Sequence, residues 1–155
     1  METIMQKITT FLWFDNNAEE AMNLYTSVFK NSKILHAGRM PDGKVMVGSF
    51  ELEGQEFMCM NAGPQFKFNE AISLMVKCDT QEEVDHYWNS LTADGGEESM
   101  CGWLKDKFGL SWQITPNILL KLMGDKDPVK AKRVMDAMLT MKKIDIKKIE
   151  EAYKG

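Results

Sequence analysis

Aromatic side chains that could line a small-molecule pocket stand on either side of a predicted turn near the middle of this chain. The turn is Asp106-Lys107-Phe108-Gly109, with Asp at the first position and Gly at the fourth. Trp103 precedes it, Trp112 follows it, and an alternation of apolar and polar residues resumes at Leu110. The segment predicts a hairpin whose two indole rings face one another and line either the core or a concave pocket.

The chemistry that such residues support is the non-covalent binding of a small, flat or amphipathic organic molecule. Aromatic rings supply stacking walls, and neutral polar side chains supply hydrogen bonds that orient a ligand. For each ring the alternative is a packed position in the core. The rings of Phe66 and Phe68, in the linker 63–69, form either a lid over the cleft or the cover of an ordinary crossover between the two modules. The candidate ligand-binding residues are the walls Trp13, Phe50, Trp103 and Trp112, the hydrogen-bonding groups Asn61, Ser73 and Gln113, and the lid residues Phe66 and Phe68.

The elements that must position these residues form an internal repeat. Residues 10–28 align without a gap with residues 73–91, an offset of 63, and each copy passes from a strand into a helix. Each helix is expected to begin with a capping box, Asn17 with Glu20 and Thr80 with Glu83, in which two side chains bond backbone amides reciprocally. The shared pattern indicates two duplicated modules.

Strand-like segments follow each expected helix. The first copy has three, at 33–40, 44–53 and 55–61, whereas the second has two, at 97–104 and 110–115. The second copy is therefore one strand short. A sheet with a helix on its outer face leaves an inner face to cover, and pairing the copies covers it with a cleft between them.

Residues 117–155 change in character and predict a helical extension. We expect helices over 117–123, from Pro128 to about Met141 after an Asp127 cap, and from an Asp145 cap to about Tyr153. Their apolar stripe is rich in methionine and packs on the chain's own sheet, on a second subunit, or on a separate partner. If the stripe packs on a separate partner, the chain is a non-catalytic interaction protein that uses its C-terminal helices.

Charge and composition set limits on the function classes. The chain has 155 residues and a net charge of −4, which divides into −8 over residues 1–115 and +4 over residues 116–155. The tail lysines have helical spacing without interleaved aromatic residues, which favours a solvated helix face over nucleic-acid binding. Neither a signal segment nor a membrane span is expected, and Cys59, Cys78 and Cys101 read as reduced thiols. We therefore expect a cytoplasmic protein.

Two stretches of the sequence resemble a known family. ITTFLWFDNNAEEAMNLYTSVF and CGWLKDKFGLSWQITP are similar to the PhnB-like branch, often labelled demethylubiquinone methyltransferase-like, of the vicinal oxygen chelate superfamily. This superfamily includes glyoxalases, extradiol dioxygenases and bleomycin-resistance proteins. The resemblance implies an α+β domain over residues 1–116, with βαβββ modules at 6–63 and 70–116 that form an open barrel-like sheet. It also implies a homodimer, with residues 117–155 lying outside the common pattern.

The same resemblance implies where a divalent metal would be held. Family enzymes bind it with His, Glu or Gln on the first and last strands of the modules, positions that fall here at Thr10, Ser73 and Gln113. Two hydroxyls and one amide are weak ligands for a divalent ion, so no metal and no other cofactor is expected. The methyltransferase label is also not supported, because Gly95-Gly96 follows a helix rather than opening one.

Three functions remain open at this point. The first is a metal-independent pocket for a small organic molecule, as in the resistance-type members of the superfamily. The second is a metal-dependent lyase, isomerase or dioxygenase with misregistered ligands, to be sought among Glu51, Glu53, Glu56 and Glu70. The third is the interaction protein described above. Thiol chemistry at Cys101 is a weaker alternative, since no neighbouring group would lower the pKa of its thiol.

Overall fold

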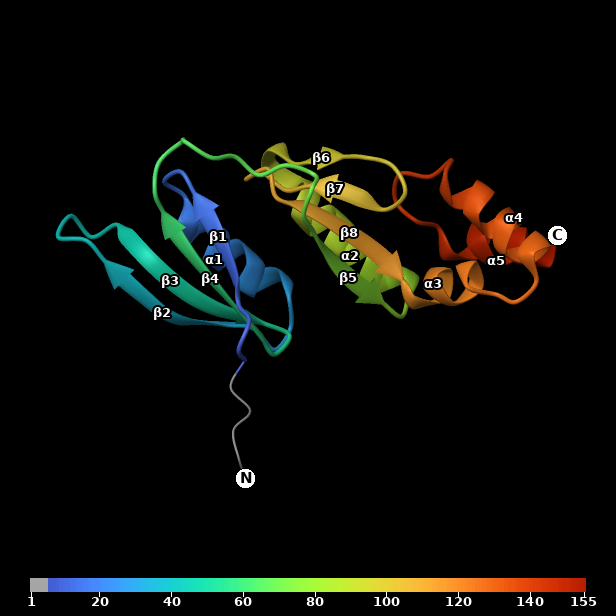
Figure 1. Ribbon diagram of the computed structural model, residues 1–155, viewed down its shortest axis with the longest axis horizontal. Coiled ribbons are helices and arrows are strands. Elements are labelled where there is room, and N and C mark those ends of the chain that lie inside the picture. Colours follow the sequence, from blue (N-terminus) through green and yellow to red (C-terminus); the bar gives the residue numbers. More distant parts are fainter. Residues whose placement is uncertain (1–5) are drawn as a thin grey trace, which may run out of the picture. The chain divides into compact units, whose positions relative to one another are not determined.

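The chain folds into two compact units that divide between Lys67 and Phe68. The computed structural model describes residues 6–155. Each unit has a four-stranded sheet, and Figure 1 shows the helix that accompanies each sheet. Three further helices follow the second sheet. These two open, mixed sheets confirm the predicted α+β class. The assignment of residues 1–116 to one domain stays a prediction, as does the homodimer.

The first sheet has the strand order β1-β4-β3-β2, in which β1 runs parallel to β4 and the other pairs are antiparallel. Side chains alternate between its faces, so Leu12 and Phe57 are buried on the face that packs against the helix. Gly48 permits this packing, since a Cβ there would lie 2.7 Å from the sulfur of Met22. The elements are β1 (Thr10–Phe14), α1 (Ala18–Val28), β2 (Lys33–Arg39), β3 (Val45–Leu52) and β4 (Gln55–Asn61).

The second sheet follows the same chain path, with the order β5-β8-β7-β6. The strand predicted over 97–104 is in fact two strands, and the missing strand of the second copy is therefore the two-residue β6. Left-handed φ angles at Cys101 (60°) and Gly102 (81°) reverse the chain between them. The elements are β5 (Ser73–Cys78), α2 (Gln81–Thr92), the short turn η1 (Ala93–Gly95), β6 (Glu97–Glu98), β7 (Trp103–Lys105) and β8 (Ser111–Pro116).

The repeat holds its offset of 63 in the helices but not in the strands. Tyr25 and Trp88, 63 apart, are both buried on the sheet-facing side of their helices. In the first strands, however, the buried Phe14 corresponds to the buried Cys78, which is an offset of 64. The connection from strand to helix is thus one residue shorter in the second copy. Because strand side chains alternate, the gapless alignment pairs residues of opposite faces.

Of the two expected capping boxes, that of α2 forms with its carboxylate bonded one residue before the cap, and that of α1 does not form. Thr80 Oγ1 accepts a hydrogen bond from the Glu83 amide (3.2 Å), and the Glu83 carboxylate accepts one from the amide of Asp79. Asn17 makes no such side-chain bond; the first amide of α1 is instead bound by Asn61 Oδ1 at 2.9 Å. A residue of β4 therefore takes over the capping of α1.

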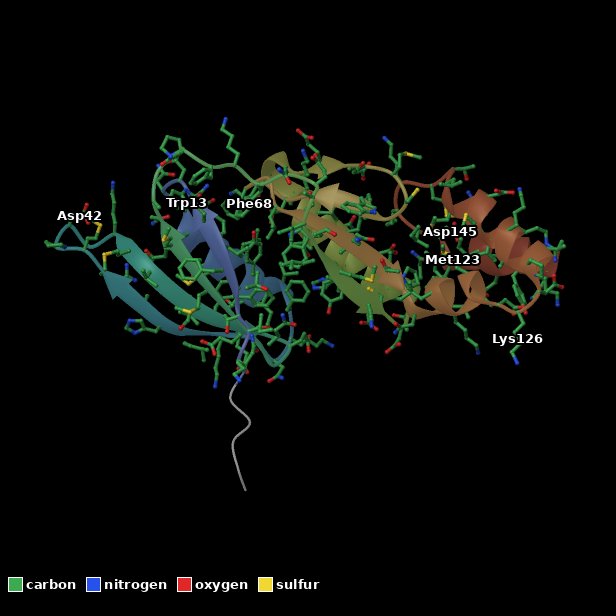
Figure 2. The ribbon with its side chains drawn as sticks, in the orientation of Figure 1. Trp13, Asp42, Phe68, Met123, Lys126 and Asp145 are labelled. Carbon is green, nitrogen blue, oxygen red and sulfur yellow. The ribbon has the colours of Figure 1, made fainter. Side chains whose placement is uncertain are left out.

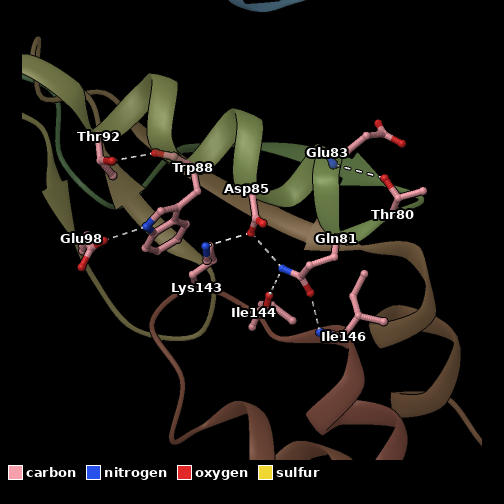
Figure 3. Close-up of polar contacts among 10 residues, drawn as sticks. All are labelled: Thr80, Gln81, Glu83, Asp85, Trp88, Thr92, Glu98, Lys143, Ile144 and Ile146. Carbon is pink, nitrogen blue, oxygen red and sulfur yellow. Dashed lines mark hydrogen bonds and ion pairs between the residues drawn. The ribbon is translucent and has the colours of Figure 1, made fainter.

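The C-terminal extension forms a small core of its own and is tied to α2. Helices α3 (Asn117–Met123), α4 (Pro128–Met138) and α5 (Ile146–Lys154) begin and end close to the predicted residues, and Asp127 and Asp145 cap the last two. Figure 3 shows how Gln81 holds the segment before α5, since its side chain donates to Ile144 O (3.1 Å) and accepts from the Ile146 amide (2.8 Å). None of the helices within residues 6–155 has the length and apolar character needed to cross a membrane.

Candidate ligand-binding site

A row of polar side chains crosses the face of the second sheet that lies opposite α2. The strand register aligns Glu97 of β6 with Lys105 of β7, Lys105 with Ser111 of β8, and Ser111 with Ser73 of β5. Residues in register point to the same face, so these four side chains form one continuous line. We call this surface the open face of the second sheet.

A second row lies beside the first on the open face. It consists of Trp103, Gln113 and Met75, one from each of three adjacent strands. Gln113 Nε2 donates a hydrogen bond to Ser73 Oγ at 2.8 Å, which joins the two rows. The remaining lone pairs of the amide and the hydroxyl are available to orient a polar ligand. Two of the predicted hydrogen-bonding residues are therefore in contact with each other.

A cavity of about 160 Å³ lies along the β6–β8 part of this face. Lys105 forms an ion pair with Glu70, which precedes β5, and both residues line the cavity. The hydrogen bond from Lys105 lowers the pKa of the Glu70 carboxyl, and the same bond raises the pKa of Lys105. Both groups are therefore charged at neutral pH. The lining includes Glu70, Glu97, Glu98, Trp103, Lys105 and Ser111.

Ser111 contributes a polar atom that the fold itself does not satisfy. The residue is fully buried, and within residues 6–155 its hydroxyl has no hydrogen-bond partner. A buried hydroxyl without a partner costs about 1–3 kcal/mol. Since Ser111 lines the cavity and its side chain belongs to the open face, a ligand entering the cavity can supply the missing partner.

The two tryptophans of the predicted hairpin lie on opposite faces of the sheet. The hairpin itself is confirmed, because β7 and β8 pair antiparallel, but Trp103 pairs with Gln113 while Trp112 pairs with Leu104. Trp112 is 2% exposed and lies on the α2 side, where its indole N–H donates to Asp106 Oδ2 at 2.9 Å. Only Trp103 lines the cavity. The expectation that the rings face one another is wrong.

The remaining predicted wall and lid residues divide between the two units. In the first unit Phe50 is fully buried in the core beneath α1 and stacks on Phe57 at 5.4 Å, which is the packed position considered as its alternative. Asn61 holds α1 and donates to Val45 O. Phe68 is the first residue of the second unit. It is half-buried and lies in the segment that leads into β5.

Trp13 and Phe66 meet within the first unit. The Trp13 indole donates a hydrogen bond to Gly63 O at 2.9 Å, and the Phe66 ring meets the Trp13 ring edge-on with centroids 4.9 Å apart. Figure 2 labels Trp13 on β1. Trp13 lies on the face opposite α1, because its neighbours Leu12 and Phe14 are buried toward the helix. The ring of the predicted lid residue Phe66 thus covers the predicted wall residue Trp13 of its own module.

The residues at the implied metal positions do not fit a divalent ion. Thr10 pairs with the buried Phe57 and so belongs to the helix face of its sheet, whereas Ser73 and Gln113 belong to the open face of the other sheet. These donors are hydroxyls and an amide, and no group of three His, Cys, Asp or Glu within residues 6–155 could hold an ion. Of the alternative ligands, Glu70 is paired with Lys105 and Glu53 occupies the β3–β4 turn.

Nucleophilic thiol chemistry also finds little support. Burial raises the pKa of the Cys59 thiol to about 11 and that of Cys78 to about 12, so both remain protonated at neutral pH. Cys101 is partly exposed in the β6–β7 turn. Of the two histidines, His36 belongs to β2 and His86 to α2.

Several residues of the site have no signal in the sequence. Lys105, Glu97 and Ser111 are ordinary polar positions of short strands, and only the register of four strands brings them into one row. Asp106 could be found as a turn residue, but its wider role depends on three donors: the amides of Phe108 and Leu110 bond to Oδ1, and Trp112 bonds to Oδ2. Each of these four residues could be assigned to the site only once the strand register of the second sheet was known.

Comparisons with known proteins give a consistent family match. The model of a family described as 3-demethylubiquinone-9 3-methyltransferase matches residues 6–115. A solved structure of a putative 3-demethylubiquinone-9 3-methyltransferase, PhnB protein, from Bacillus cereus is 43% identical, with a TM-score of 0.68 over 72% of this chain and 99% of the other. No curated protein matches.

A second solved structure shares the fold at much lower identity. Protein PA1353 from Pseudomonas aeruginosa is 17% identical, with a TM-score of 0.60 over 72% of this chain and 98% of the other. The family match ends at residue 115, one residue before the end of β8. The three C-terminal helices therefore lie outside the matched region.

Proposed function

This chain belongs to the 3-demethylubiquinone-9 3-methyltransferase family. On that premise we propose that it is a small-molecule-binding member of the glyoxalase/bleomycin resistance superfamily, which binds an organic ligand on the open face of its second sheet without using a metal ion. The observation that supports this most directly is the cavity of about 160 Å³ with the buried Ser111 hydroxyl and the Trp103 ring in its lining. An aromatic wall with a few placed polar groups is typical of small-molecule sites.

The donor set supports binding without a metal. Ser73 and Gln113 are neutral and already share a hydrogen bond, so they suit a ligand hydroxyl, carbonyl or amine better than a divalent ion. A methyl-transfer reaction draws no support from the fold. Adenosine-based methyl donors are usually bound at a glycine-rich turn between a parallel strand and a helix, and here Gly95 lies in η1, after α2.

Fluorescence titration tests the proposal. Trp103 gives the cavity an intrinsic reporter, so we expect a saturable change in emission with at least one member of a panel of small aromatic amines, alcohols and acids. The change should persist in excess EDTA and should be lost in Trp103→Phe. No saturable response from any compound would overturn the proposal.

Elemental analysis of freshly purified protein separates the metal-dependent alternative. A stoichiometric transition metal that EDTA removes together with ligand binding would establish that alternative instead.

The variant Gln113→Leu tests the hydrogen-bonding role of this side chain, because it retains the volume of the side chain but removes its amide. We expect it to weaken binding about tenfold, because the amide would orient the ligand.

A further inference from the structure

The cavity on the open face of the second sheet has an excess of negative charge. Three acidic residues, Glu70, Glu97 and Glu98, are among its lining residues, together with one basic residue, Lys105. Glu70 neutralises Lys105 through their ion pair. Glu98 accepts a hydrogen bond from the Trp88 indole at 2.9 Å, which Figure 3 shows on the side of α2. The charge of Glu97 also helps to raise the pKa of Lys105, so on the open face two carboxylates, those of Glu70 and Glu97, stand against one ammonium group.

The buried hydroxyl of Ser111 gives this acidic cavity a second, independent mark of a ligand site. Ser111 stands in the same row as Glu97, with Lys105 between them. Its oxygen lacks a partner within the described chain and can accept a hydrogen bond from an N–H group. An ammonium group has only donors, and it is therefore complementary both to this oxygen and to the carboxylate of Glu97 in the same row.

The size of the cavity and the Trp103 ring restrict the ligand further. An engineered apolar cavity of roughly 150 Å³ admits a benzene molecule, so 160 Å³ suits a compact ligand of similar size. Trp is the side chain that attracts cations most strongly through its ring face. We propose that the cavity takes a small organic amine in its cationic form, with an apolar or aromatic group against Trp103. This inference rests on the proposed function, whose ligand class it names.

Isothermal titration calorimetry with three compounds of nearly equal shape tests the ligand class. Benzylamine is cationic at neutral pH, benzyl alcohol is neutral and benzoate is anionic. We expect benzylamine to bind about fivefold more tightly than benzyl alcohol, the upper range for a solvent-exposed charge pair, and benzoate to bind most weakly. The preference should shrink when salt is raised to about 0.5 M, because these carboxylates are exposed to solvent.

Three variants test which side chains produce the preference for the cationic ligand. Glu97→Gln should reduce the affinity for benzylamine about threefold and leave that for benzyl alcohol unchanged. Lys105→Met should strengthen benzylamine binding, because it releases Glu70. The matched control is Glu82→Gln, which removes an exposed carboxylate from α2 outside the cavity lining and should change neither affinity.

The outcomes separate the two proposals. Absence of benzylamine binding, equal binding of the alcohol, or tighter binding of benzoate would overturn the amine inference. The proposed function would survive the last two results, since a ligand would still occupy the site. An equal loss of benzylamine affinity in Glu82→Gln and Glu97→Gln would also overturn the inference, since it would place the cation elsewhere.

Discussion

The indole N–H of Trp112 donates a hydrogen bond to Oδ2 of Asp106, 2.9 Å away, and both residues are 2% exposed. The other carboxylate oxygen accepts from the amides of Phe108 and Leu110, so one side chain closes the hairpin and anchors the largest ring on the α2 face of the second sheet. A buried carboxylate with three donors is a costly group to remove from a fold.

Replacement of Asp106 should therefore destabilise the protein strongly. Asp106→Ala leaves two amides and one indole N–H without their acceptor, and we expect a loss of about 3 kcal/mol in the free energy of unfolding, measured in urea. Trp112→Phe removes a single donor together with part of a ring and serves as the partner in a double-mutant cycle. Strict additivity of the two changes would contradict a coupling between Asp106 and Trp112.

Ser111→Ala should stabilise the protein that lacks ligand. The change removes a buried hydroxyl without a partner, and we expect a gain of about 1 kcal/mol in the free energy of unfolding. The same variant should bind benzylamine several-fold more weakly, because the acceptor for the ligand is gone. Ser73→Ala is the comparison, since its hydroxyl is hydrogen-bonded to Gln113 and its removal should destabilise. A destabilised Ser111→Ala would show that the hydroxyl is already satisfied.

Gln81→Ala should loosen the C-terminal extension. Gln81 bonds the carbonyl of Ile144 and the amide of Ile146, on the two sides of the Asp145 cap. We expect hydrogen exchange at the Ile146 amide to accelerate at least tenfold, with a loss of about 1–2 kcal/mol in stability. Lys143→Met, which breaks the exposed ion pair with Asp85 (2.8 Å), should cost at most about 1 kcal/mol. Unchanged protection at Ile146 in the first variant would contradict the role of Gln81.

Stability should fall at alkaline pH because of the two buried thiols. The folded protein raises the pKa of Cys59 to about 11 and of Cys78 to about 12, mainly through burial, from an ordinary value of 9.0. Above pH 9 the unfolded chain therefore loses thiol protons that the folded chain keeps. The stabilisation is complete below pH 9 and is lost as the pH rises toward 12. Cys78→Ala should flatten this part of the pH profile, and a profile identical to that of the parent would contradict the assignment.

Thiol labelling gives an independent measurement of the same burial. At pH 8 a disulfide reagent should react rapidly with Cys101, which is partly exposed, and slowly with Cys59 and Cys78. Unfolding in urea should expose all three. Rapid modification of Cys78 in the native protein would contradict its burial.

The order of the elements could be predicted from the sequence because capping residues and strand alternation are local signals. Asp127, Asp145 and Gly124 mark helix boundaries that the structure reproduces closely. The site could not be predicted in the same way, since it depends on the pairing of strands. A four-residue turn would have placed Trp103 opposite Trp112, but Asp106 also pairs with Leu110, and this slip of one residue turns the rings to opposite faces.

The two-residue strand β6 escaped prediction for a different reason. Glu97 and Glu98 have no apolar alternation to identify them, and β6 exists because it pairs with Lys105 and Leu104 of β7. The polar row depends on that pairing, because Glu97 joins it only through β6. Residues whose position follows from long-range pairing leave no local trace in a single sequence.

The strand-to-helix connection that is one residue shorter in the second copy restricts how the halves of this protein can be interchanged. A chimaera that replaced β1 with β5 according to the gapless alignment would present Lys77 to α1 and turn Cys78 toward solvent. A successful graft has to carry the connecting turn with the strand, since the helix would otherwise meet the wrong side of its new partner.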